Sequence, residues 1–492
     1  MTLDPRTPVL VGAGQFVQRP EKLEEALEPA AMMAEAVSAA ATDSGASALV
    51  ERAGLIVAVK GAWSYPDPAR LVADRLGASR ATTALTGDGG NTPQSVINLL
   101  AREIAAGDLD VGVLVGAEAI WSRRRMRAAG MDRSVTRQAP GARPDRTVGS
   151  QVPMSSDNER SRGFEMPVHF YPTFESALRH ARGETLDGHR ARISELWSRF
   201  NAVAVNNPFA WSRRPMTAEE IRTPSSDNRM VGFPYTKAMN SNWDLDQAAA
   251  VIVCSAGAAD AAGVPRDRWV FLHAGTDAHD TLMVSNRWSL GRSPAIRAAG
   301  RRVLELAGAG VDDIGHVDLY SCFPSAVQVA ASEIGLSEQR QLTVTGGLTF
   351  AGGPLNNYVT HSVATMVSVL RSDPGSLGLV TANGGFLTKH AMGVYSTEPP
   401  TGGFRWQDVQ DEVDAAPTRE VAEEHDGPAE IEAYTVMFGR EGPERALVSC
   451  LLADGRRTWG HSSEADIMKA MTEEEFVGTA VTMSATGVFK VG

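Results

Sequence analysis

The stretch from Leu342 to Tyr358 reads LTVTGGLTFAGGPLNNY, and it decides the fold. A β-branched run ends in a first glycine pair, Gly346 and Gly347, and a second pair, Gly352 and Gly353, comes immediately before Pro354. Paired glycines let a backbone approach a ligand closely, and a helix N-terminus offers free N–H donors. Proline is tolerated at the first helical position. The pattern therefore predicts a strand over 342–347, a glycine-lined turn, and a helix over 354–370.

Length and composition indicate a soluble protein of several domains. The chain has 492 residues, too many for one ordinary core, and 43% of them are hydrophobic. The net charge of −12 argues against nucleic acid and anionic membranes as bulk partners. The three cysteines, Cys254, Cys322 and Cys450, lie far apart in apolar surroundings. We therefore expect no disulfide framework, no membrane span and a reducing, cytoplasmic location.

Short apolar runs alternate with helical patterns along most of the chain. Such alternation predicts right-handed βαβ units and a largely parallel sheet with helices on its faces. Strands are expected at 9–14, 55–60, 82–87, 110–118, 248–256, 269–274, 316–323, 342–347, 377–385 and 392–396. Helices are expected at 29–41, 68–76, 93–105, 294–307, 324–335 and 354–370.

The glycine–proline pattern occurs twice. Residues 89–96 read GGNTPQSV, which repeats the order of strand, glycine pair, proline and apolar helix seen at 352–358. The stretch 346–354 also resembles the thiolase superfamily, where the pattern is G-G-x-x-x-x-G-H-P before a buried helix. The resemblance covers roughly residues 6–398 and is closest to the sterol-carrier-protein type. It implies a five-layer αβαβα body built from two repeated halves, with a loop domain inserted into the first half.

This resemblance and the composition divide the chain into five parts. The parts are an N-terminal thiolase half (1–120 and 241–268), a basic loop domain (121–240), a C-terminal thiolase half (269–400), an acidic linker (401–430) and a small β domain (431–492). The last part has short alternating strands, which favour a five-stranded barrel of the OB type. It carries nine Asp and Glu against six Lys and Arg, so we expect it to touch the body or a protein partner and not nucleic acid.

The inserted segment 121–240 is basic within an acidic protein. It holds 20 Lys and Arg against 12 Asp and Glu, a balance of +8. One interpretation is a solvated surface subdomain. The other is a site for an anionic ligand with several phosphates, such as coenzyme A, bound by Arg123, Arg124 and Arg125.

Three residues that thiolase chemistry requires are missing from the matching motifs. The nucleophilic cysteine position falls at Gly89, or at Gly90 if the alignment slips by one residue. The active-site histidine position is Gly353. The C-x-G-G motif reads Ala382-Asn383-Gly384-Gly385, which keeps the glycines without the thiol. The sequence therefore predicts a site without a covalent nucleophile.

Several polar groups remain in the matching motifs. The N-E-A-F or H-D-C-F motif of thiolases reads Tyr320-Ser321-Cys322-Phe323, so a cysteine just before a helix could keep a lowered pKa. The other interpretation is that Cys322 is a buried small hydrophobe. His390 is the best remaining titratable group at the site, whereas His361, inside a helix, reads as a packed histidine.

The resemblance implies an acetyl-CoA acetyltransferase-like protein of acyl-CoA or lipid metabolism whose active site has degenerated. Two alternatives stay open. One is an active acyltransferase or thioester enzyme that uses Cys322 and His390, with Tyr320 beside them. The other is a non-catalytic binding or scaffold subunit whose C-terminal domain recruits a protein partner.

The expected small molecules are coenzyme A, acyl-CoA or a lipid, held at Gly346, Gly347, Gly352, Gly353, Asn383, Gly384 and Gly385. No tightly bound cofactor or metal is expected. Thiolases are usually dimers, although an added domain can cover that surface.

Overall fold

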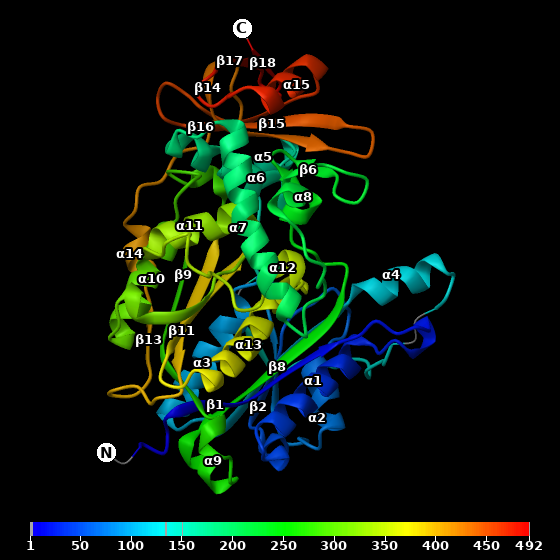
Figure 1. Ribbon diagram of the computed structural model, residues 1–492, viewed down its shortest axis with the longest axis vertical. Coiled ribbons are helices and arrows are strands. Elements are labelled where there is room, and N and C mark those ends of the chain that lie inside the picture. The colour runs from blue at the N-terminus through cyan, green and yellow to red at the C-terminus, as the bar shows by residue number, and fades with distance from the viewer. Residues whose placement is uncertain (1–2, 133–134, 150, 492) are drawn as a thin grey trace.

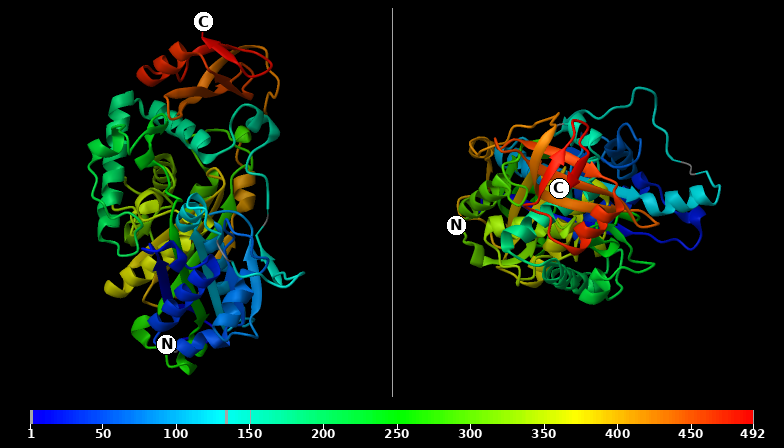
Figure 2. Two further views of the ribbon diagram at one scale, coloured as in Figure 1. Left: turned by 90° about the vertical axis from the view of Figure 1, so that its right-hand side faces the viewer. Right: turned by 90° about the horizontal axis from the view of Figure 1, so that it is seen from above.

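The computed structural model describes residues 3–132, 135–149 and 151–491 (Figure 1). Two similar α/β halves form the body, and a small β domain lies at the opposite end from the first half (Figure 2). Among the described residues, no helix is long and apolar enough to cross a membrane.

The first half contains a sheet in the order β1-β8-β4-β2-β3. Its strands are β1 (Pro8–Val17), β2 (Leu55–Ala58), β3 (Thr82–Thr86), β4 (Val111–Ala119) and β8 (Asp246–Ser255). Strands β2, β3 and β4 are parallel, and β8 runs antiparallel between β4 and β1. A short strand from the inserted segment, β5 (Arg146–Val148), pairs with the outer edge of β3, so this edge is covered.

The second half repeats the order of the first with one strand fewer. Its sheet runs β9-β12-β11-β10, with β12 antiparallel to both of its neighbours. The strands are β9 (Val270–His279), β10 (Ile314–Asp318), β11 (Leu377–Gly384) and β12 (Lys389–Ser396). A short antiparallel pairing between β1 and β9 joins the two halves into one continuous sheet system.

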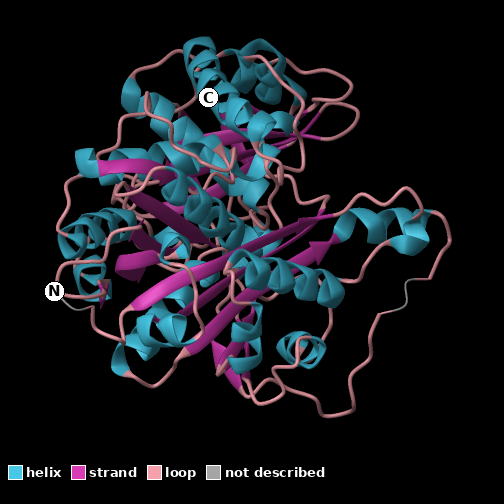
Figure 3. Cartoon of the chain, turned by 60° about the horizontal axis from the view of Figure 1, so that its bottom comes forward, coloured by secondary structure: helices cyan, strands magenta, loops and turns pink. Residues whose placement is uncertain are grey.

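Helices form three layers around these sheets. The central helices α3 (Thr92–Ala106) and α13 (Tyr358–Ser372) contact strands of both halves and each other. Helices α1 (Pro29–Asp43) and α2 (Pro68–Arg75) pack on the first half, and α10 (Pro294–Ala307) packs on the second beside α11 (Pro324–Ile334). Figure 3 shows the strands enclosed by helices. Two further helices are α9 (Ala256–Ala261) and α12 (Gly347–Phe350).

The deciding stretch differs from its prediction in two ways. Residues 342–346 form no strand, because their polar groups turn inward to the buried carboxylate of Asp318. That carboxylate accepts hydrogen bonds from Thr343 Oγ1 at 2.7 Å, from Val344 N at 2.9 Å and from Tyr358 Oη at 3.0 Å. The helix begins at Tyr358 and not at Pro354, which precedes a short 3₁₀ turn.

Helices predominate among the elements of the inserted segment, which contacts both halves of the body. Its elements are α4 (Ile120–Ala128), α5 (Asp157–Ser161), α6 (Pro167–Arg182), α7 (Leu186–Asn206), α8 (Ala218–Arg222), β6 (Met230–Gly232) and β7 (Tyr235–Thr236). Helix α4 projects from the body, as Figure 1 shows, whereas α6 and α7 pack on α11.

The C-terminal domain is a strongly curved sheet in the order β16-β15-β14-β17-β18. Its elements are β14 (Gly427–Phe438), β15 (Pro443–Leu451), β16 (Arg457–Ser462), α15 (Ala465–Glu473), β17 (Ala480–Met483) and β18 (Phe489–Val491). One isolated bridge from His461 to Val488 brings the two ends of the sheet together without a continuous ladder. Strand β6 of the inserted segment pairs with β14, so the two added parts share one sheet.

The acidic segment 401–430, expected to be a linker, is built into the body. It contains β13 (Arg405–Asp408), which adds to β9 in parallel, and α14 (Gln410–Asp414), which packs on α10. Further along, Thr418 bridges to Arg287 and Val421 bridges to Arg457. Charge patterns in the sequence do not report backbone pairing, so they gave no sign that this segment adds a strand to the sheet.

Candidate functional site

Neither glycine at the expected nucleophile position leaves room for a side chain. A Cβ atom on Gly90 would lie 2.3 Å from Tyr320 Oη and 2.5 Å from the carbonyl oxygen of Asn383. A Cβ on Gly89 would lie 2.4 Å from Asn91 Oδ1, and the φ angle of +147° at Gly89 also favours glycine. Tyr320 therefore occupies the space that a cysteine at the start of α3 would need.

The expected histidine position is also filled, and the position of the lost second thiol is buried. A Cβ on Gly353 would lie 2.2 Å from Ser241 Oγ, so a serine of the segment before β8 occupies the space of the expected histidine. Ala382 is buried within β11 beside Thr381, whose hydroxyl accepts a hydrogen bond from the backbone N–H of Tyr320. The three losses therefore belong to one rearranged and closed region.

The glycines predicted to bind substrate lie against other parts of the protein. A Cβ on Gly346 would lie 2.4 Å from the Cβ of Ala204 on α7, and the φ angle of Gly346 is +99°. A Cβ on Gly352 would meet Gln247 Oε1 at 2.2 Å. The same close approach occurs at Gly347, beside Ser321, at Gly384, beside Asn91, and, less closely, at Gly385, beside Thr388. These glycines permit tight internal packing.

Cys322 does not have the lowered pKa that its place before a helix suggested. Its side chain is buried, and burial raises the pKa of the thiol to about 12, although nearby donors, with Tyr171 the strongest, oppose that shift. The Nδ2 atom of Asn383 lies 3.8 Å from the sulfur. Of the two interpretations of Cys322, this environment favours the buried small hydrophobe, because the desolvation cost exceeds the effect of the donors.

Ellman's reagent is expected to label none of the three cysteines in the native protein at pH 8. All three are free and buried, and burial raises the pKa of each thiol, to about 12 for Cys254 and Cys322. A raised pKa leaves little thiolate at pH 8, and the thiolate is the form that reacts. Unfolding in guanidinium should expose three reactive thiols. A fast native reaction that Cys322→Ser removes and Cys254→Ser retains would contradict this reading.

His390 is buried beside a carboxyl group. Its Nε2 atom lies 3.3 Å from Oδ2 of Asp280. Burial favours a higher pKa for Asp280, but the hydrogen bond and charge of His390 outweigh it, and the pKa of this carboxyl is lowered. Asp280 also accepts hydrogen bonds from Ser293 Oγ and from the backbone N–H of Ala295, at the start of α10. The pair thus fastens β12 to α10, which supplies a structural role for His390.

A tyrosine from the inserted segment completes the closure. Tyr171 on α6 stacks on Phe323, with ring centroids 4.4 Å apart. Its hydroxyl accepts hydrogen bonds from Asn383 Nδ2 and from the backbone N–H of Leu387, both at 2.9 Å. The cavity beside Tyr320 has a volume of only about 10 Å³, room for about one water molecule. Sequence analysis missed Tyr171, because no motif marks a residue that reaches the site only through tertiary packing.

The arginines of α4 lie on the surface at the carboxyl end of β4. Arg124 and Arg125 form ion pairs with Asp244 at 3.2 and 3.9 Å, and Arg123 donates to the carbonyl oxygen of Ala62 at 2.6 Å. Arg125 also lies over the ring of Trp121. Each contact uses part of a five-donor guanidinium group, so donors remain for an anion.

Within the described ranges, no cluster of three or more His, Cys, Asp or Glu could hold a metal ion.

Comparison with known proteins identifies the added domain first. Residues 408–488 match the family described as the thiolase-like protein type 1 additional C-terminal domain. No protein of curated function matches the sequence.

Solved structures match the whole chain. A monomeric SCP2-thiolase like protein type 1 from Mycobacterium smegmatis is 30% identical, with a TM-score of 0.86 and complete coverage of both chains. A structure described as the Ltp2-ChsH2(DUF35) aldolase is 18% identical, with a TM-score of 0.61 over 80% of this chain and 98% of that one. The dimeric peroxisomal thiolase of Saccharomyces cerevisiae is 13% identical, with a TM-score of 0.57 over 81% and 99%. The last two establish the thiolase fold of the body.

Proposed function

Because the chain belongs to the SCP2-thiolase-like proteins of type 1, we propose that it is an acyl-CoA-binding protein of lipid metabolism without ordinary thiolase activity. The observation that supports this proposal is the filled space at Gly90, where Tyr320 and Asn383 exclude a nucleophilic side chain. Removal of a covalent nucleophile removes the step that splits acyl transfer into two easier reactions.

The buried state of the remaining polar groups favours binding over catalysis. An enzyme that used Cys322 would need a thiolate, and burial raises the pKa of this thiol to about 12. An enzyme that used His390 would need to bring substrate to a side chain that is buried beside a cavity of only about 10 Å³. The alternative of an active acyltransferase therefore has less support than a binding role.

Coenzyme A is proposed to bind through its phosphates at Arg123, Arg124 and Arg125. Replacement of all three by alanine is expected to weaken coenzyme A binding about tenfold or more, because charge-assisted hydrogen bonds to phosphate are lost. Calorimetric titration at low salt would measure both affinities. A matched control replaces Arg266, Arg301 and Arg302, which are partly exposed and lie elsewhere, and should leave the affinity unchanged. Equal affinity in wild type and the α4 variant, or no binding by wild type, would refute the proposal.

A protein partner for the C-terminal domain remains a second proposal. The name Ltp2-ChsH2(DUF35) aldolase joins two components, which supports a search for a partner of this thiolase-like chain as well. This domain has a sheet of five strands, and the bridge from His461 to Val488 joins the two ends of that sheet. Both features support an OB-like description of the domain.

We also propose that the chain is a monomer, in line with the relative from Mycobacterium smegmatis. Support comes from the edge of β3, where Ala84 pairs with Arg146 and Thr86 pairs with Val148 of β5. The new edge strand β5 has only three residues, and so short an edge is a poor template for pairing with a second copy.

A further inference from the structure

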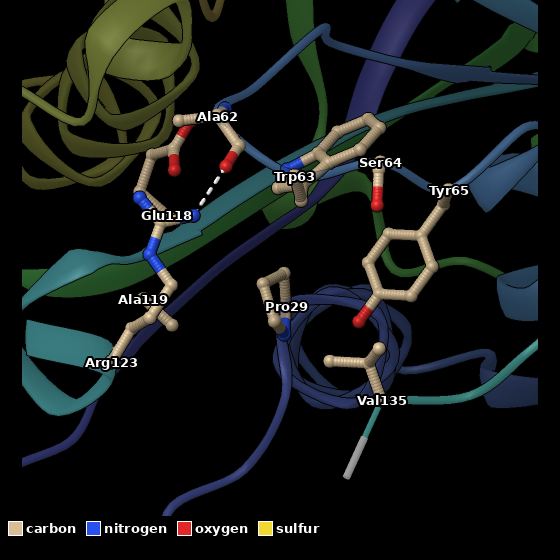
Figure 4. Close-up of a pocket in the computed structure, with 9 residues that line it drawn as sticks. All are labelled: Pro29, Ala62, Trp63, Ser64, Tyr65, Glu118, Ala119, Arg123 and Val135. Carbon is tan, nitrogen blue, oxygen red and sulfur yellow. Dashed lines mark hydrogen bonds between the residues drawn. The ribbon is translucent and has the colours of Figure 1, made fainter. Parts of the chain in front are cut away.

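A second and larger cavity lies away from the closed site, at the carboxyl end of β4. Its volume is about 240 Å³, and it shares no lining residue with the small cavity beside Tyr320. It opens between the loop after β2, the start of α1 and the first turn of α4 (Figure 4). The lining residues are Pro29, Ala62, Trp63, Ser64, Tyr65, Glu118, Ala119, Arg123 and Val135.

A buried carboxyl group forms the inner wall of this cavity. Glu118 on β4 is 2% exposed, and its Oε1 atom accepts a hydrogen bond from the backbone N–H of Ala62 at 2.8 Å. Among the described residues, no other donor bonds to this carboxyl group. A buried carboxylate with one hydrogen bond is costly, and burial raises the pKa of Glu118 to about 7. The group therefore has acceptor capacity that the protein leaves unused.

The loop that carries Ala62 is fitted closely against Glu118. A Cβ on Gly61 would lie 2.3 Å from Trp63 Nε1 and 2.5 Å from Glu118 Oε1. Glycine at this position thus allows the loop to bring a backbone donor and an aromatic ring to the carboxyl group. The close packing of this loop against Glu118 gives this side of the cavity a defined shape.

Two aromatic rings form the opposite wall. The ring centroids of Trp63 and Tyr65 are 5.5 Å apart. Their polar atoms point to protein acceptors, since Trp63 Nε1 donates to the carbonyl oxygen of Ala117 and Tyr65 Oη donates to Glu28. In Figure 4 the two rings lie across the cavity from Glu118 and Arg123. A ligand would therefore meet largely apolar ring surfaces on this side.

The charges around the cavity limit the ligand class. The guanidinium group of Arg123 lies at the rim, and the ammonium group of Lys60 lies 5.4 Å from the Trp63 ring centroid. Both act on Glu118 through their charge and oppose a second cation there, and Asp246 acts on Glu118 in the opposite direction. Glu118 itself opposes an anion. An uncharged molecule that donates a hydrogen bond is repelled neither by the two cations nor by the carboxylate.

We propose that this cavity binds a small uncharged ring compound whose hydroxyl group donates a hydrogen bond to Glu118 while its ring lies against Trp63 and Tyr65. The site is separate from the closed thiolase-like site, and it borders the proposed coenzyme A site at Arg123. A bound donor would satisfy the acceptor atom that the fold leaves unpaired inside the cavity.

Phenol and anisole are a matched pair of probes, because both carry an oxygen on the ring and only phenol donates. Ligand-detected nuclear magnetic resonance titration of the full-length protein is expected to show phenol binding about tenfold tighter than anisole. Phenol should also bind about fivefold tighter at pH 8.5 than at pH 5.5, since an ionised carboxylate is the stronger acceptor. Glu118→Gln should remove this pH dependence.

Blocking the mouth tests the location. Ala62 is exposed and lines the cavity, so Ala62→Phe should abolish phenol binding, whereas Ala128→Phe on the outer part of α4 should not. A crystal soaked with 4-bromophenol should show anomalous bromine density beside Trp63. Equal affinity for phenol and anisole, no binding at millimolar phenol, or binding that survives Ala62→Phe would each overturn the proposal.

Discussion

Acetoacetyl-CoA mixed with coenzyme A and the purified protein is expected to give no thiolysis above the buffer rate. The reaction needs a cysteine that attacks the thioester, and the two positions that could carry it are Gly89 and Gly90. The loss of acetoacetyl-CoA absorbance measures the rate, with an active thiolase as the positive control. A turnover number of about 1 per second or more, ordinary for an enzyme, would contradict the proposed function.

The variant Gly90→Cys is expected to remain inactive and to be less stable than wild type. A side chain there would overlap Tyr320 Oη, 2.3 Å from the Cβ position, and the backbone oxygen of Asn383, which cannot move aside as a flexible side chain can. Overpacking of this kind typically costs about 1–3 kcal/mol. Thermal unfolding should show a lowered midpoint, and thiolysis by this single variant would mean that the site is less closed than its geometry indicates.

Replacement of Arg457 by leucine is expected to lower the free energy of unfolding by about 3–5 kcal/mol. Arg457 is fully buried and pairs with Glu432 through two hydrogen bonds of 2.7 Å. It also donates to the carbonyl oxygens of Ser285 and Arg287, so it joins the C-terminal domain to the second half of the body. Its loss leaves a half-buried carboxylate without its cationic partner and buried backbone carbonyl groups without this donor.

The neighbouring Arg456 provides the matched control. Arg456 is exposed and pairs with Asp454, so Arg456→Leu should change stability by about 0.5 kcal/mol or less. The double variant Arg457→Met, Glu432→Met should be less destabilised than Arg457→Leu, because no charge is then left unpaired. Thermal unfolding followed by circular dichroism compares all of these proteins. Equal midpoints for Arg457→Leu and Arg456→Leu would show that the domain junction does not depend on this pair.

The sequence by itself determined the alternating α/β body and its relation to thiolases. Helices α10 and α11 begin at their prolines, Pro294 and Pro324, as predicted, because helix starts follow local rules for caps and for residues without an N–H group. The loss of the cysteine at Gly89 or Gly90 and of the histidine at Gly353 is equally visible, since motif positions are read residue by residue.

The tertiary structure alone decided what replaced the lost residues. Tyr320 and Ser241 fill the vacated space, and Tyr171 reaches the site from an inserted helix. Residues 342–346 look like a strand in sequence but bond to Asp318, and Cys322 has a raised pKa in place of a lowered one. Contacts between segments far apart in sequence, and the desolvation that they impose, set these outcomes, and no local pattern of residues encodes either quantity.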